Sequence, residues 1–64
     1  MEIIGIWTSR DTYSAEESAR DSITIGELIR ELENYDEDAK VVFVNDNGYT
    51  YGRISTRGIN DITE

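Results

Sequence analysis

The segment between residues 24 and 35 constrains the fold more than any other, because it has the pattern of a helix with a defined start and one apolar face. Thr24 precedes Glu27 by three residues, which is the spacing of a capping box. Apolar residues then recur at spacings of three and four, namely Ile25, Leu28, Ile29, Leu32 and Tyr35. The sequence therefore predicts a helix over 25–35, and its apolar face needs a second element to cover it.

A β-hairpin is predicted directly after this helix. Residues 40–44 are rich in Val and Phe, which favour strands, and residues 49–54 have the composition of a returning strand. The Asn-Gly dipeptide at 47–48 is a strong signal for a two-residue hairpin turn. Such a turn fixes the register. Residue 46 then lies opposite 49, residue 41 lies opposite 54, and Phe43 lies opposite Gly52, where the aromatic ring covers the bare backbone.

The predicted register divides the hairpin into two faces. We expect Val41, Phe43 and Ile54 to pack on the helix. The other face carries Tyr, Val and Arg side chains, which suit a protein interface. Its residues, a candidate homodimer contact, are Val42, Val44, Tyr49, Tyr51 and Arg53. The two tyrosines could instead stack on unpaired bases, but a net charge of −8 opposes nucleic-acid binding.

The N-terminal part adds one more strand and a polar connection. Residues 2–8 are Ile-rich and predict a strand, which would pair beside 40–45 or beside a last strand at 59–62. Residues 9–22 contain Ser14 and Glu17 at the spacing of a capping box, but their low apolar content favours an acidic loop over a short helical turn. The expected fold is one α+β domain over 1–64, with one main helix packed on a three- to four-stranded, mostly antiparallel sheet.

The composition argues against catalysis and against cofactors. The chain has neither Cys nor His, so disulfides, thiolate metal sites and the commonest general base are absent. Carboxylates at 36–38 could bind Mg²⁺ and support a nuclease, but a solvated acidic turn is the favoured interpretation. We expect a non-enzymatic protein without cofactor or metal. Because no apolar run approaches the length of a bilayer span, we also expect it to be cytoplasmic, with no membrane partner.

Negative charge is concentrated in one part of the chain. Residues 1–40 carry eleven of the fourteen carboxylates and four basic side chains, a net charge of −7, whereas residues 41–64 carry a net charge of −1. An acidic segment of this kind repels nucleic acid and attracts basic surfaces. The candidate partner-binding residues are Glu16, Glu17, Asp21, Glu27, Glu31, Asp36, Glu37 and Asp38.

Residues 24–43, about a third of the chain, resemble a pattern found in short proteins of phages and bacterial mobile elements. In these proteins a capped ELI-x-EL helix runs through a YD-x-DA turn into an apolar strand. The pattern is structural, so it transfers no functional residues. The small size and acidity are also similar in type to anti-CRISPR proteins that act as DNA mimics.

These observations favour a non-enzymatic inhibitor that acts by binding. The expected partner is a basic nucleic-acid-binding protein or a nuclease complex. The acidic residues of 1–40 would bind the surface with which this partner otherwise binds nucleic acid. The alternative is a homo-oligomeric structural or nucleic-acid-binding module that uses the face bearing Tyr49 and Tyr51.

Overall fold

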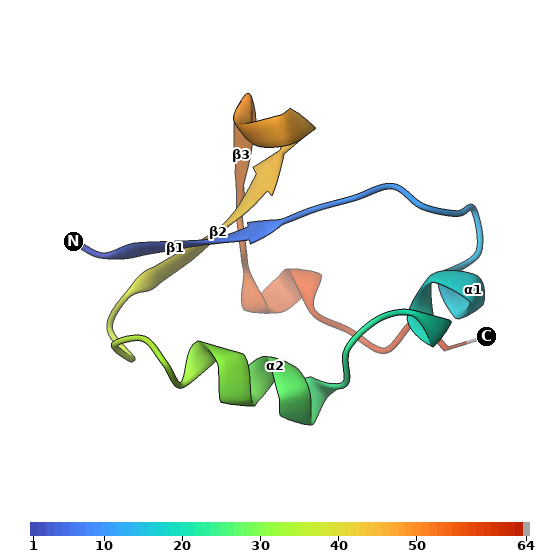
Figure 1. Ribbon diagram of the computed structural model, residues 1–64, viewed down its shortest axis with the longest axis horizontal. Helices are drawn as coiled ribbons and strands as arrows, with labels where there is room; N and C mark the ends of the chain where they lie inside the picture. Colours follow the sequence, from blue (N-terminus) through green and yellow to red (C-terminus); the bar gives the residue numbers. More distant parts are fainter. Residues whose placement is uncertain (64) are drawn as a thin grey trace.

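The computed structural model describes residues 1–63 and contains a three-stranded sheet and two α-helices (Figure 1). The strands are β1 (Ile3–Trp7), β2 (Lys40–Asn45) and β3 (Thr50–Arg53), the helices are α1 (Ala15–Arg20) and α2 (Ile25–Leu32), and the 3₁₀ turns are η1 (Asp46–Gly48) and η2 (Thr56–Gly58). The α+β class is therefore confirmed, with α2 as the main helix.

The sheet has the order β1-β2-β3, and its two pairings differ in direction. β2 and β3 form the expected antiparallel hairpin, but β1 pairs with β2 in parallel, with Ile4 beside Val41 and Ile6 beside Phe43. The prediction of a mostly antiparallel sheet is therefore wrong. The physical reason is the connection: a parallel pair needs a crossover of a dozen or more residues, and residues 8–39 supply one that contains both helices.

Helix α2 begins as predicted and ends earlier than predicted. The Thr24 hydroxyl accepts a hydrogen bond from the Glu27 amide (3.1 Å), and the Glu27 carboxylate accepts one from the Thr24 amide (3.2 Å), which confirms the capping box. The helix ends at Leu32 instead of residue 35, and the Tyr35 amide donates to the Leu32 carbonyl in a tighter turn. Acidic residues at this end are unfavourable next to the partial negative charge of a helix C-terminus.

A short helix lies in the segment for which an acidic loop was favoured. α1 starts after Ser14, whose hydroxyl accepts a hydrogen bond from the Glu17 amide (3.2 Å). The Thr12 hydroxyl donates to the Ser14 carbonyl (2.6 Å) and fixes the approach to this cap. The loop interpretation is therefore wrong, and the helical turn that the Ser14–Glu17 spacing indicates is confirmed; local capping outweighs the low apolar content.

The hairpin has the predicted register but a longer turn. Phe43 lies opposite Gly52, and the last pair is Asn45 with Thr50, so four residues connect the strands instead of two. The backbone is left-handed at Asp46 (φ 51°) and Asn47 (φ 56°). The register is as predicted because the longer loop removes only the predicted pair of residues 46 and 49 and does not shift the pairs farther from the turn. The predicted pairing of residues 41 and 54 lies beyond the end of β3.

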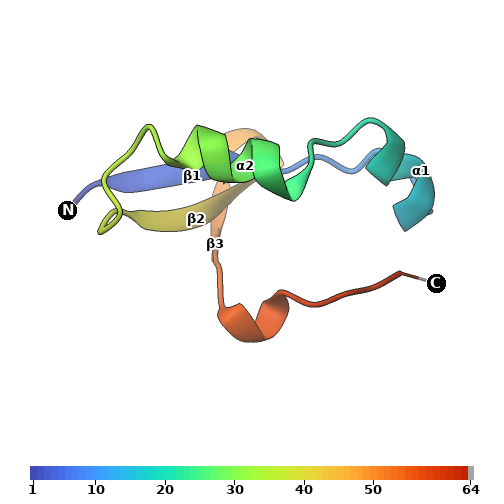
Figure 2. The same ribbon diagram turned by 90° about the horizontal axis from the view of Figure 1, so that it is seen from below.

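Helix α2 lies below the β1–β2 pair in Figure 1 and overlaps it in Figure 2, but it makes hardly any contact with the strands and does not bury its apolar residues there, so the predicted packing of the main helix on the sheet is not found. Ile25 and Ile29 are 80% and 52% exposed. Within residues 1–63 Val44 is the one buried hydrophobic residue, at 6% exposure. The core is therefore small and sits in the sheet itself.

The faces of the hairpin are only partly as predicted. Val41 and Ile54 are half-buried, whereas Phe43, expected on the same covered face, is 37% exposed. Val44, predicted on the exposed face, is instead the most buried side chain. Its Cγ2 atom occupies the space next to Gly5, where a Cβ would lie only 2.7 Å away. The bare backbone at Gly5 is what makes room for Val44.

Gly5→Ala should destabilise the protein by about 1–3 kcal/mol, because the added methyl group overpacks the site beside Val44. Gly26→Ala is the matched control. It lies in α2 with no neighbour closer than 3.9 Å to the added Cβ, and it should stabilise by about 0.5–1 kcal/mol through helix propensity. Urea unfolding of dilute protein measures both. Equal effects of the two substitutions would contradict the close contact of Gly5 with Val44.

Asn47→Ala should cost about 1 kcal/mol, because alanine tolerates the left-handed backbone poorly, whereas Asn47→Gly should be neutral or slightly stabilising. Thermal unfolding of the two variants tests this difference. A lower melting temperature for the glycine variant than for the alanine variant would contradict the left-handed conformation at this residue.

Candidate acidic docking surface

The parallel pairing of β1 with β2 turns residues 8–39 into one crossover connection, and most of the net charge lies in it. The crossover contains ten carboxylates and three arginines, so its net charge is 3 − 10 = −7, out of −8 for the chain. The sequence showed this imbalance; the structure adds that the charged residues belong to a single excursion from the sheet.

All eight candidate partner-binding residues lie on this crossover. Three lie on α1 or at its C-terminal cap, two lie on α2, and three lie in the turn that leads to β2. All eight are exposed. Figure 2 shows α1, α2 and the following turn as one row along the molecule, displaced from η2. On α2, Glu27 and Glu31 are four residues apart and so lie on one face of the helix.

The charge of this surface is not neutralised by ion pairs. Within residues 1–63 the one ion pair joins Arg10 to Asp46 (3.8 Å), and Asp46 is not among the eight. Neither Arg20 nor Arg30 lies within ion-pair distance of a carboxylate of its helix. The carboxylates of the crossover therefore keep their charge exposed to solvent, and the net charge of −7 is not reduced by direct ion pairing among the described residues.

Two of the eight carboxylates also serve the local fold. Glu27 closes the capping box of α2, and Asp36 accepts a hydrogen bond from the Asp38 amide (2.9 Å) in the turn that follows. The other six make no side-chain hydrogen bond to the part of the chain that the structure describes. These six, which we call the docking carboxylates, are Glu16, Glu17, Asp21, Glu31, Glu37 and Asp38.

A shallow groove of about 560 Å³ runs beside the C-terminal end of α2. Its lining is partly apolar, from Ile29, Leu32 and Tyr35, and partly acidic, from Glu33 and Glu37. Apolar groups next to carboxylates suit an Arg or Lys side chain, which has an apolar stem and a cationic head. Sequence analysis had not selected Glu33, because its place beside this groove depends on where α2 ends.

A second hollow, of about 430 Å³, lies between the segment after β1 and the end of α1. Its polar lining residues are Ser9, Asp11, Ser18, Asp21 and Ser22. It adds Asp11, a carboxylate that sequence analysis had not selected, to the same acidic surface. The Asp11 carboxylate accepts a hydrogen bond from the Ser9 hydroxyl (2.7 Å).

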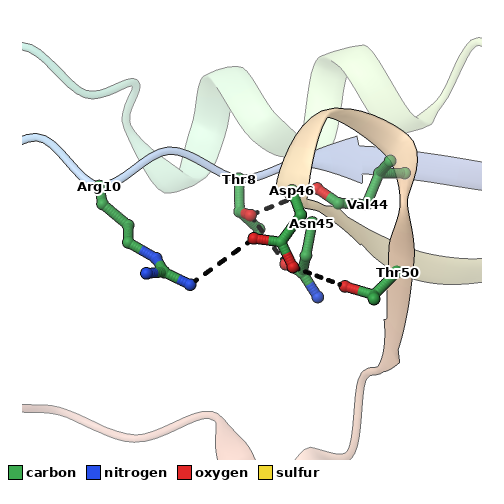
Figure 3. Close-up of polar contacts among 6 residues, drawn as sticks. All are labelled: Thr8, Arg10, Val44, Asn45, Asp46 and Thr50. Carbon is green, nitrogen blue, oxygen red and sulfur yellow. Dashed lines mark hydrogen bonds and ion pairs between the residues drawn. The ribbon is translucent and has the colours of Figure 1, made fainter.

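A cluster of polar contacts fixes the start of the crossover against the hairpin (Figure 3). The Thr8 hydroxyl lies 2.8 Å from Asn45 Oδ1 and 3.2 Å from the Val44 carbonyl oxygen, both of which are acceptors. Asp46 accepts a hydrogen bond from the Thr50 hydroxyl (3.0 Å) and faces Arg10. Thr8 and Arg10 are more than thirty positions away in sequence from the hairpin residues that they contact, so no local pattern could have indicated these contacts.

The alternative binding face on the hairpin is only partly available. Tyr49 and Tyr51 are 86% and 67% exposed, and Arg53 is exposed as well. Val42 is half-buried and Val44 is buried, so these two side chains offer little contact area to a partner. The face therefore keeps its aromatic and basic groups but loses much of its aliphatic part.

One carboxyl group outside the crossover has a perturbed acidity. The hydroxyl and the amide of Thr63 both donate to Asp61 Oδ1 (2.6 and 2.9 Å), and together they lower the pKa of this carboxyl below its usual range. The group is fully exposed at the end of the described chain, so it stays ionised to slightly lower pH without taking part in the acidic surface.

Comparison with known proteins finds no matching family model, no matching curated protein and no matching solved structure.

Among residues 1–63 no three carboxylates come close enough together to hold a metal ion, so the turn at 36–38 gives the nuclease hypothesis no geometric support. The described helices are all too short or too polar to cross a membrane.

Thr24→Ala should lower the free energy of unfolding by about 1 kcal/mol, because the Glu27 amide loses its acceptor at the start of α2. Thr24→Ser retains the hydroxyl and should change stability by only a few tenths of a kcal/mol. Urea unfolding followed by circular dichroism measures both variants. Equal losses in the alanine and serine variants would show that the hydroxyl does not cap this helix.

Proposed function

We propose that this protein is a non-enzymatic inhibitor that binds a nucleic-acid-handling protein complex through its acidic crossover. The observation that carries the proposal is the net charge of −7 on residues 8–39, whose carboxylates are exposed and form no ion pair with any residue of the described range 1–63. A surface of this kind presents negative charge to the Lys and Arg side chains that otherwise contact phosphates. It acts as a DNA mimic, as some anti-CRISPR proteins do.

The shape of the surface beside α2 supports the same proposal. The groove beside α2 combines apolar and acidic groups, so it suits a basic side chain better than it suits a metal ion or a small anion. Charge on this scale also speeds association, because long-range attraction steers a basic partner toward the crossover. The interaction should be fast and should weaken as salt rises.

The proposal predicts that neutral substitutions in the crossover weaken binding more than the same charge change elsewhere. The test variant combines Glu16→Gln, Glu17→Gln and Glu31→Gln. The control combines Glu2→Gln, Asp61→Asn and Glu64→Gln, which removes the same charge outside the crossover. Three exposed ion pairs at about 0.2–1 kcal/mol each give a loss of roughly tenfold in affinity for the test variant.

The measurement starts with capture of the partner from the native host at low salt and its elution at high salt. The affinity of the purified partner for the wild type and both variants is then measured, together with displacement of DNA from that partner. We expect weaker binding and weaker displacement only for the test variant. Equal affinities for the two variants, or capture of no nucleic-acid-binding protein, would rule out this function.

A further inference from the structure

The described protein exposes far more surface than a self-contained domain of its size. Its accessible area is 6328 Å², whereas a folded monomer of 7.3 kDa exposes about 4,200 Å². Its radius of gyration is 13.0 Å, against about 11 Å for a compact chain of this length. The excess is larger than the roughly 800 Å² that each partner buries in a standard protein interface. A second molecule therefore has enough uncovered surface to bind.

The outer edge of β1 offers backbone hydrogen bonds to such a molecule. The Lys40 amide donates to the Glu2 carbonyl (2.9 Å), and the Thr8 amide donates to the Val44 carbonyl (3.0 Å). Because backbone groups of alternate residues point to opposite edges of a strand, the even-numbered residues of β1 face β2. The N–H and C=O groups of Ile3, Gly5 and Trp7 therefore point away from the sheet.

This edge lacks two of the usual features that prevent strands from pairing, namely charge and proline. Between Ile3 and Trp7 there is no charged residue and no proline. Natural edge strands are commonly protected by charge, proline, a bulge or a covering element. The other edge of the sheet, β3, is a residue shorter and ends in Arg53. β1 is thus the better template for adding a strand.

We propose that β1 pairs antiparallel with β1 of a second copy of this chain, about a twofold axis that passes beside Gly5. In this register Ile3 lies opposite Trp7 of the second copy, Ile4 lies opposite Ile6, and Gly5 lies opposite Gly5. The outward-pointing groups of the three odd-numbered residues then exchange six backbone hydrogen bonds across the axis. The two three-stranded sheets become one six-stranded sheet.

The strand is complementary to itself in this register. Ile3 and Trp7 are 58% and 66% exposed in the single chain, and their alternation places both on one sheet face. Pairing sets a β-branched side chain beside an aromatic one on each side of the axis, which is a favourable cross-strand combination. Glu2 comes opposite Thr8 and not opposite another carboxylate, so no like charges meet directly. An isologous contact of this kind closes as a dimer.

The dimer and the docking function use different surfaces and respond oppositely to salt. Each copy carries a net charge of −8, so the two copies repel one another and dissolved salt should strengthen the dimer. Salt should weaken the attraction between the crossover and a basic partner. Failure of one proposal therefore leaves the other standing, and the direction of the salt effect separates them.

Sedimentation equilibrium of the full chain at low and high salt tests the dimer. We expect a species of twice 7.3 kDa whose dissociation constant falls as salt rises. Ile3→Pro removes an outward N–H that β2 does not use, so it should yield a monomer with an unchanged circular-dichroism spectrum. Ile62→Ala, at an exposed residue outside the sheet, should remain dimeric. A wild type that stays monomeric at millimolar concentration, or a proline variant that dimerises equally well, overturns the proposal.

Cysteine cross-linking tests the register against a background without native cysteine. Directly opposite residues have Cα atoms about 5.5 Å apart, within reach of a disulfide. A mixture of Ile3→Cys and Trp7→Cys chains should cross-link readily with oxidised glutathione. Either variant alone should not, because like positions lie about 14 Å apart. Cross-linking of Ile3→Cys alone as readily as the mixture would show a different pairing and contradict this register.

Discussion

The parallel pairing of β1 with β2 is the contact on which the rest of the structure depends. Backbone hydrogen bonds from Lys40 to Glu2 and from Thr8 to Val44 lie at its two ends, and the Thr8 side chain reinforces the second end. Because the two strands run in the same direction, the chain between them must travel the length of the sheet and return. That return contains both helices and a net charge of −7. An antiparallel pairing of the same strands would place the helices and their carboxylates differently around the sheet.

The fold gains little stability from a conventional core. Val44 is buried because Gly5 leaves space for it, while the apolar side chains of α2 remain largely in contact with solvent. Local interactions therefore determine much of the structure: the two helix N-terminal caps, the left-handed turn after β2 and the hydrogen bond from Thr50 to Asp46. A domain this small rarely obtains more than about 3–5 kcal/mol from its core. Association with other molecules, through an edge strand or through the acidic crossover, is consistent with this open construction.

Two features that the sequence predicts correctly have local determinants. The capping box of α2 and the register that pairs Phe43 with Gly52 both follow from residues close together in the chain. Other local predictions are wrong, namely the loop at 9–22 and the two-residue hairpin turn, and features that distant residues decide could not be predicted at all. The direction of β1 depends on contacts between Thr8 and the end of β2, and the burial of Val44 depends on a glycine far away in sequence. For the acidic surface, the charge imbalance is visible in the sequence. The sequence also predicts that Glu27 caps α2, but only the hydrogen bonds in the structure separate Glu27 from the docking carboxylates. The groove beside Glu33 depends on the early end of α2.

The most direct test of this account is the direction of β1, measured by nuclear Overhauser effects in a uniformly labelled sample. The parallel pairing predicts backbone contacts between Ile4 and Val41 and between Ile6 and Phe43, so that residue numbers rise together along the two strands. Contacts of Ile6 with Val41 and of Ile4 with Phe43 would instead show an antiparallel pair. In that case residues 8–39 would not form the crossover, and the single acidic surface would lose its structural basis.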